Sequence, residues 1–143
     1  MALIGRALRR LESVPYWLLA LPLRLAVATV FWNSGTSKLA NWNTTIELFT
    51  EEYKVPVLPP EIAAYMAASI ELATPVLLAL GLLTRPAALV LLGMTAFIEI
   101  FVYPQAWPTH IQWAAMLLVL LCRGAGAISV DHLIRRWWQR RKA

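Results

Sequence analysis

Long runs of apolar residues, separated by short polar segments, organise this chain. A helix that crosses a bilayer needs about 20 mostly apolar residues. Such runs cover residues 16–36 and 62–83, and shorter ones cover residues 86–103 and 110–122. The pattern predicts an all-α, polytopic membrane protein in which four transmembrane helices form a single bundle domain over residues 1–143.

Two segments outside these spans also have helical patterns. In the predicted outer loop, residues 39–61, the stretch from Thr44 to Tyr53 reads as one amphipathic helix, which the following prolines end. Residues 131–142 repeat apolar side chains at helical spacing between arginines: Leu133, Ile134, Trp137 and Trp138. The second pattern is typical of a helix on a membrane surface, and it predicts an amphipathic C-terminal tail.

The composition agrees with a membrane protein. Hydrophobic residues make up 59% of the chain, and its mean hydropathy is +0.60, whereas soluble domains are about 45–50% apolar. The 143 residues leave no room for a separate catalytic module. A single cysteine, Cys122, excludes an internal disulfide and a redox-active cysteine pair. The first apolar run lacks a signal-peptide cleavage site before Asn33, so we expect a retained helix.

The net charge of +5 is unevenly distributed and predicts an orientation. Basic residues gather near the start, in the turn that contains Arg85, and in the tail, whereas residues 39–61 contain four glutamates against Lys54. Because cytoplasmic loops are enriched in Lys and Arg, both termini are predicted to be cytoplasmic. The basic ends are expected to contact anionic lipids and not nucleic acid.

Three ionisable residues fall within the predicted spans: Arg24, Glu71 and Glu99. An ionised side chain at mid-membrane costs at least ~2.5–3.5 kcal/mol, so these residues should not face lipid. Helix rise places them about 12, 18 and 20 Å from the inner ends of their helices. We therefore predict that the three side chains converge inside the bundle as charge pairs.

Further polar residues lie toward the predicted outer side and define a candidate pocket. Asn33, Lys38 and His110 belong to this set. Lys38 either extends to the interface or closes a polar pocket together with Glu99 and His110. The buried charges either fix the helix register or line a cavity for a proton-coupled or redox-active lipid-soluble ligand. No metal site is predicted.

Several short motifs together resemble the DoxX family of small bacterial and archaeal membrane proteins. The resemblance extends from about residue 23 to residue 131. It rests on Arg24, the Gly35-x-x-Lys38-Leu39 and Ile70-Glu71-Leu72 segments, the Leu80-Gly-Leu-Leu-Thr-Arg85-Pro-Ala-Ala88 turn, and the Gly124-x-Gly126-Ala-Ile-Ser129-x-Asp131 ending.

The resemblance implies a four-helix bundle in the bacterial inner membrane. It carries Arg24, Lys38, Glu71, Arg85 and Asp131 over as matching positions, without assigning catalytic roles. Some family members are similar to subunits of quinone-linked sulfur oxidoreductases. Others look like partners of oxidative-stress enzymes or lie beside genes for modified metal-binding peptides. From the residues themselves, Gly126 is expected to form the turn after the fourth helix, and Ser129 to Asp131 to cap the tail helix.

Two functions of different classes follow. The first is an accessory subunit of a quinone-linked membrane redox system, with quinone as a ligand. The chain shows no intrinsic cofactor site, since it lacks a cysteine cluster and a Gly-rich fingerprint, so a protein partner must exchange the electrons. The second is a non-catalytic anchor or assembly partner for a stress-response or metal-peptide maturation system. A small transporter and a homo-oligomer are left open, as is whether the protein is an enzyme.

Overall fold

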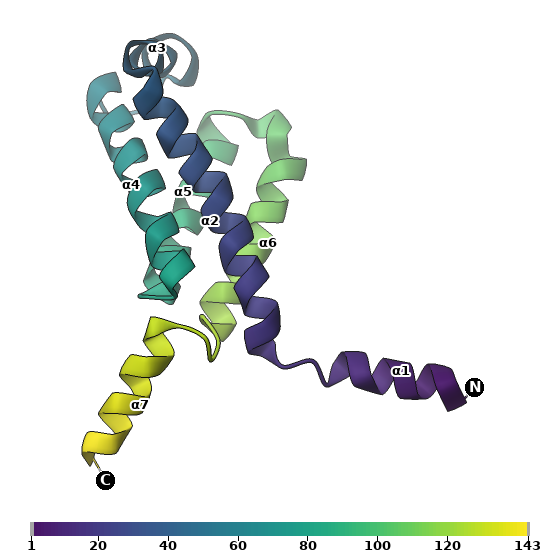
Figure 1. The fold of residues 1–143 in the computed structure, drawn as a ribbon. Coiled ribbons are helices and arrows are strands. Elements are labelled where there is room, and N and C mark those ends of the chain that lie inside the picture. The colour runs from purple at the N-terminus through teal and green to yellow at the C-terminus, as the bar shows by residue number, and fades with distance from the viewer. Residues whose placement is uncertain (1, 143) are drawn as a thin grey trace.

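The computed structural model describes residues 2–142, which are helical almost throughout and contain no strand. Four long helices run side by side: α2 (Tyr16–Ala40), α4 (Pro60–Leu80), α5 (Thr84–Phe101) and α6 (Trp107–Arg123) (Figure 1). The shorter elements are α1 (Ala2–Glu12), α3 (Trp42–Leu48), the π-helical turn η1 (Phe49–Tyr53), the 3-10 turn η2 (Pro104–Ala106) and α7 (Val130–Lys142). The predicted all-α fold class is confirmed.

Three of these helices, α2, α4 and α5, are long and apolar enough to cross a membrane. They correspond to the predicted spans 16–36, 62–83 and 86–103, with ends shifted by no more than four residues. The predicted span 110–122 is a helix, α6, of 17 residues. Its length of about 26 Å is slightly less than the ~30 Å hydrocarbon core, so its crossing of the membrane stays a prediction.

The bundle is packed solidly in one half. We call the end where α2 begins and α4 ends the α7 end, and the opposite end the α3 end. Val27, Leu78, Leu91 and Leu117, one from each long helix, are almost fully enclosed and lie from the middle toward the α7 end. Large apolar side chains also cover the outward faces, as expected for helices surrounded by lipid.

Helices α2 and α4 approach each other closely at Gly35. A Cβ atom at this position would lie 2.9 Å from the side chain of Leu72 and 3.1 Å from the backbone of Glu71. The glycine therefore permits the contact, as small residues do between membrane helices. This contact also fixes the height of Glu71 relative to α2.

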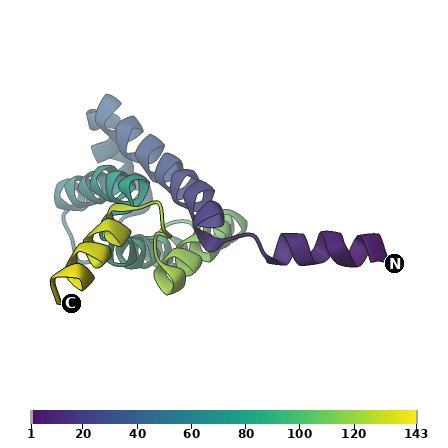
Figure 2. The same cartoon turned by 60° about the horizontal axis from the view of Figure 1, so that its bottom comes forward.

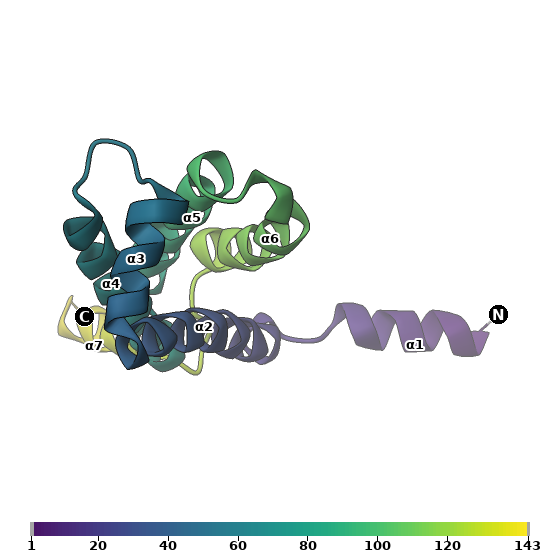
Figure 3. The same ribbon diagram turned by 90° about the horizontal axis from the view of Figure 1, so that it is seen from above.

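Helix α3 and turn η1 cover the α3 end, as Figure 3 shows from above. The predicted amphipathic helix from Thr44 to Tyr53 is confirmed, although it begins at Trp42 and widens into π-helical turns. Phe49 of η1 packs on Ala63 and Ala64 of α4. Because its apolar face is buried in this way, the segment forms one wall of the space between the helices.

Helices α1 and α7 extend away from the bundle at the α7 end (Figure 1). Apolar side chains of α1 at positions 3, 4, 8 and 11 are exposed, while arginines occupy its other side. The sequence predicted α7 as an amphipathic basic helix, which is confirmed, but it predicted no helix at α1. Figure 2 shows the segment before α7 passing the long helices at the α7 end. Both helices have the pattern of surface-lying elements.

Candidate functional site

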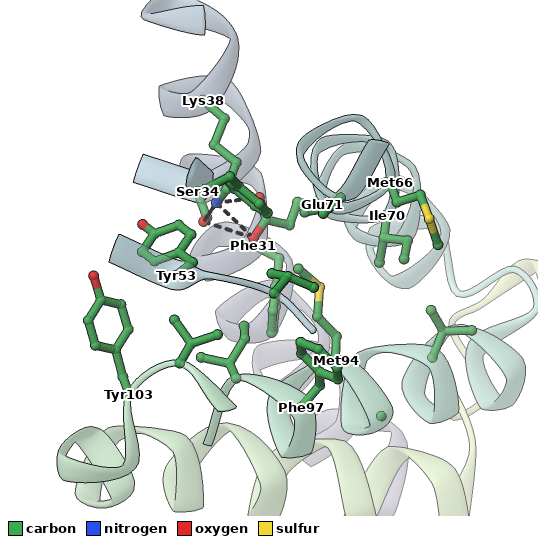
Figure 4. Close-up of a pocket in the computed structure, with 18 of the residues that line it drawn as sticks. Phe31, Ser34, Lys38, Tyr53, Met66, Ile70, Glu71, Met94, Phe97 and Tyr103 are labelled. Carbon is green, nitrogen blue, oxygen red and sulfur yellow. Dashed lines mark hydrogen bonds and ion pairs between the residues drawn. The ribbon is translucent and has the colours of Figure 1, made fainter. Parts of the chain in front are cut away.

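A cavity of about 580 Å³ opens between the long helices toward the α3 end. Apolar side chains form most of its wall, among them Phe31 of α2, Met66 and Ile70 of α4, and Met94 and Phe97 of α5 (Figure 4). The volume lies within the ~300–1,000 Å³ range of small-molecule sites, which are mostly apolar with a few polar groups.

The polar groups of this cavity gather around Lys38. Its ammonium nitrogen lies 2.8 Å from Oε2 and 3.1 Å from Oε1 of Glu71. The ammonium also donates to Ser34 Oγ (2.9 Å), and the Ser34 hydroxyl donates to Glu71 Oε1 (3.0 Å). The Glu71 side chain is 3% exposed and that of Lys38 17%, so the ammonium is the more accessible member. Figure 4 shows this cluster across the cavity from Met94 and Phe97.

Helical spacing explains which residues of α2 reach the cavity. Ser34 and Lys38 are four residues apart and share one face of the helix. Asn33 is rotated by about 100° from Ser34 and is exposed outside the cavity. The prediction that Asn33 lines the pocket is therefore wrong, whereas Lys38 and Glu71 do line it.

His110 and Glu99 form a second pair. The Nδ1 atom of His110 lies 2.6 Å from Oε2 of Glu99. The histidine side chain is buried and lines the cavity, while Glu99 lies outside the lining and is 32% exposed. His110 also contacts the ring of Trp113, which packs against Phe31. The sequence left open whether Lys38 extends to the interface or joins Glu99 and His110; in the structure Lys38 pairs with Glu71 instead.

Aromatic hydroxyl groups border the cavity at the α3 end. The rings of Tyr53 and Tyr103 meet edge-on, 5.5 Å apart, and both line the cavity. The Tyr103 hydroxyl donates a hydrogen bond to Glu52. Burial raises the pKa of both phenols above the usual value of 10, and the bond to Glu52 raises that of Tyr103 further. Both hydroxyls therefore stay neutral at physiological pH.

The structure places Arg24 at the α7 end, where it binds backbone carbonyls. Its guanidinium donates to the oxygens of four residues at 2.6–2.9 Å: Leu78, Ala79, Ala125 and Ile128. The first two belong to the last turn of α4, whose carbonyls have no partner within the helix. The prediction that Arg24 converges with Glu71 and Glu99 is therefore wrong. Arg24 joins the segment after α6 to the end of α4.

Asp131 completes this junction from α7. Its carboxylate accepts hydrogen bonds from the backbone N–H groups of Leu83 (2.8 Å) and Thr84 (3.0 Å), and so caps the start of α5. The sequence predicted that Ser129 to Asp131 cap the tail helix. Only Ser129 does so, by accepting a bond from the N–H of His132.

The remaining predicted motif residues are also at the α7 end. Gly126 has a φ of +85°, and a Cβ there would lie 2.9 Å from the Cα of Trp17, so the predicted turn needs glycine. Gly124 follows the last residue of α6. Arg85 is exposed and donates to the carbonyl oxygen of Cys122 at 3.3 Å.

Replacing Asp131 with alanine should lower the free energy of unfolding by ~1–2 kcal/mol, because it leaves two N–H groups of α5 without an acceptor. Asp131→Asn keeps one side-chain oxygen and should cost less. Thermal unfolding in detergent micelles measures both. Equal stability of wild type and Asp131→Ala would contradict the capping role.

Sequence reasoning missed Gly93, which lines the cavity from α5. A Cβ atom at this position would meet no atom within 4 Å. A glycine in the interior of an apolar helix was the available signal, because it costs helix stability relative to alanine. Within residues 2–142, no group of three or more His, Cys, Asp or Glu side chains is placed to hold a metal ion.

Comparison with known proteins identifies the family. The DoxX family profile matches residues 19–104, which include Arg24, Lys38 and Glu71. An uncharacterized protein of Haemophilus influenzae is 30% identical over 129 residues, which cover 80% of this chain and 82% of that protein. No solved structure matches the chain. Together with its apolar helices, the match shows that the chain is a membrane protein of the DoxX family.

Proposed function

We propose that this DoxX protein binds a lipid-soluble ligand with a polar head, of the quinone class, in the cavity near Lys38. The observation that supports this is an apolar cavity of about 580 Å³ with a buried Lys38–Glu71 pair on one wall. A buried charge pair is costly to place in a membrane, which favours a functional use. The protein then acts as an accessory subunit of a quinone-linked membrane redox system.

The membrane arrangement that supports the proposal has four spans, with α6 as the fourth. Helix α6 packs against α5 and α2, and these two helices cover its buried face. Basic residues of α1, α7 and Arg85 gather at the α7 end, which we place in the cytoplasm of a bacterial inner membrane. The cavity then opens in the half of the membrane away from the cytoplasm.

Part of the cavity wall is exposed on the outside of the bundle, and this part gives a ligand access from the bilayer. Met66 of α4 and Val90 and Gly93 of α5 line the cavity and are also exposed on the outside of the bundle. This side of the bundle faces lipid in the proposed arrangement. A ligand dissolved in the bilayer can therefore enter between α4 and α5 without passing through water.

Different residues of the cavity bind different parts of the ligand. The ammonium of Lys38 donates a hydrogen bond to a carbonyl oxygen of the ligand, and Glu71 keeps that ammonium charged and positioned. The apolar wall holds the ring and the start of the tail, and excludes water. A bound quinone supplies reversible uptake of electrons and protons. The electrons must come from a partner protein, since the residues of the site carry no electron carrier of their own.

An anchoring function is the second candidate, and α1 and α7 favour it. Both are basic amphipathic helices that extend from the bundle, so they present surfaces on which a partner can assemble. This function needs no ligand in the cavity. Binding of quinone therefore separates the two candidates.

The test is the amount of quinone retained by protein purified into nanodiscs, measured by solvent extraction and absorbance. Gly93→Leu should lower it by at least about tenfold, because a difference of ~1.4 kcal/mol in binding has this effect and the new side chain fills the cavity. Since nothing lies within 4 Å of the Cβ position, folding should be preserved.

Ala96→Leu is the matched control, because it adds side-chain volume to α5 at a position outside the cavity lining. It should retain as much quinone as the wild type. Absence of quinone from the wild type after incubation with quinone-containing membranes would overturn the proposed ligand. Equal retention by Gly93→Leu would show that quinone binds elsewhere.

A further inference from the structure

A second hollow, of about 540 Å³, lies at the α7 end of the bundle. Its wall comes from the start of α5, the end of α6, the Gly124–Gly126 segment and α7. Three arginines from three different helices contribute to it: Arg85 of α5, Arg123 of α6 and Arg135 of α7. Segments distant in the sequence thus bring three positive charges to one place.

These charges are not balanced by carboxylates within the described part of the chain. None of the three arginines forms an ion pair there. Arg85 has only the 3.3 Å bond to the carbonyl of Cys122, and Arg123 stacks on the ring of Tyr16 at 4.8 Å. Both interactions leave guanidinium N–H groups available.

The acidic residue in the wall does not change this balance. Both carboxylate oxygens of Asp131 already accept backbone N–H groups at the start of α5. The other titratable group of the wall is His132, which carries no negative charge. The hollow therefore has a surplus of positive charge and of hydrogen-bond donors.

Apolar side chains also line the hollow, at a depth that suits a lipid. Pro86, Ile134 and Trp138 line the hollow beside the arginines. The hollow adjoins the ends of α5 and α6, where the hydrocarbon region meets the headgroups in the arrangement proposed above. A soluble anion would use the arginines alone, whereas a lipid would also use these apolar side chains.

We propose that this hollow binds the phosphate of an anionic phospholipid, with the headgroup among Arg85, Arg123 and Arg135. Guanidinium groups bind phosphate oxygens in pairs of parallel hydrogen bonds. Basic pockets between membrane helices on the cytoplasmic side bind such headgroups. The bound lipid bridges α5, α6 and α7, and so adds to the hydrogen bonds of Arg24 and Asp131 at this junction. The site does not depend on a ligand in the cavity near Lys38.

The test compares wild type with Arg85→Gln/Arg135→Gln in detergent micelles that contain phosphatidylcholine with or without phosphatidylglycerol. Native mass spectrometry counts retained phosphatidylglycerol. We expect the variant to retain roughly thirtyfold less, since each basic residue near an anionic surface contributes ~1 kcal/mol and two are removed. Its thermal midpoint should no longer rise when phosphatidylglycerol is added, as that of the wild type does.

Arg136→Gln/Arg140→Gln is the matched control. This control also removes two positive charges, both from residues of α7 that lie outside the hollow. It should retain phosphatidylglycerol as the wild type does. An equal loss in both variants would overturn the site and indicate general surface charge. Inorganic phosphate raising the thermal midpoint as much as the lipid would also overturn the proposal, because the ligand would then be a soluble anion.

Discussion

Replacing Arg24 with methionine should lower the free energy of unfolding by about 4 kcal/mol or more. The substitution keeps most of the side-chain volume but removes the guanidinium from four backbone carbonyls, of which that of Leu78 keeps another donor, the N–H of Gly81. Each buried acceptor left without a partner costs ~1–3 kcal/mol, and the carbonyls nearest the surface regain water, so the expected total lies well below four times the maximum.

The measurement is unfolding of the purified protein by titration with a denaturing detergent, followed by circular dichroism. Arg24→Lys should recover part of the loss, because one ammonium can bind some of the four carbonyls but lacks the planar fork of arginine. Arg136→Gln removes a charge from an exposed position of α7 and should change stability by less than ~0.5 kcal/mol. A loss no larger for Arg24→Met than for this control would contradict the structural role.

Replacing Glu71 with methionine should cost about 3–5 kcal/mol, the range found when one member of a buried ion pair is removed. The ammonium of Lys38 would keep its charge in a mostly apolar cavity and lose its counter-charge. The same unfolding titration measures the effect. Lys38 is the more exposed of the two, so partial rotation toward water makes the lower part of the range the expectation.

The double variant Lys38→Met/Glu71→Met provides the decisive comparison. It removes both charges and keeps the volumes, so it should be close to wild type in stability, as replacement of whole buried pairs often is. It should nevertheless lose quinone, because the polar group that binds the head is gone. A double variant as unstable as Glu71→Met would show that Glu71 acts through contacts other than Lys38.

The sequence predicted which residues avoid lipid better than it predicted their partners. Apolar run length identified the long helices, and the rarity of charges within them identified Arg24, Glu71 and Glu99. Estimated height then suggested that the three meet. Helical side chains, however, lean toward the N-terminus of their own helix. On α2 this directs Arg24 toward the α7 end, away from Glu71. The same lean directs Lys38 toward the α7 end. Helix α4 runs antiparallel to α2, so the lean directs Glu71 toward the α3 end, and the two side chains meet.

Other features had no readable signal in the sequence. The partners of Arg24 are carbonyl oxygens, which every residue carries, so no pattern of side chains marks them. The bond from Asp131 to the start of α5 joins residues 47 and 48 positions apart. The motif that contains Asp131 could be recognised in the sequence, but the helix that this residue caps could not. Helix α1 is shorter than a span, and its alternation of arginine and leucine was read only as a basic start.

The bundle is asymmetric along its long axis, because one half is packed and the other half holds the cavity. The buried apolar layer of Val27, Leu78, Leu91 and Leu117 separates the cavity from the α7 end. Under the proposed function, a proton exchanged near Lys38 would move toward the α3 end, where Tyr53 and Tyr103 line the cavity. Electron transfer to or from a ligand in this cavity would thus exchange protons with one face of the membrane.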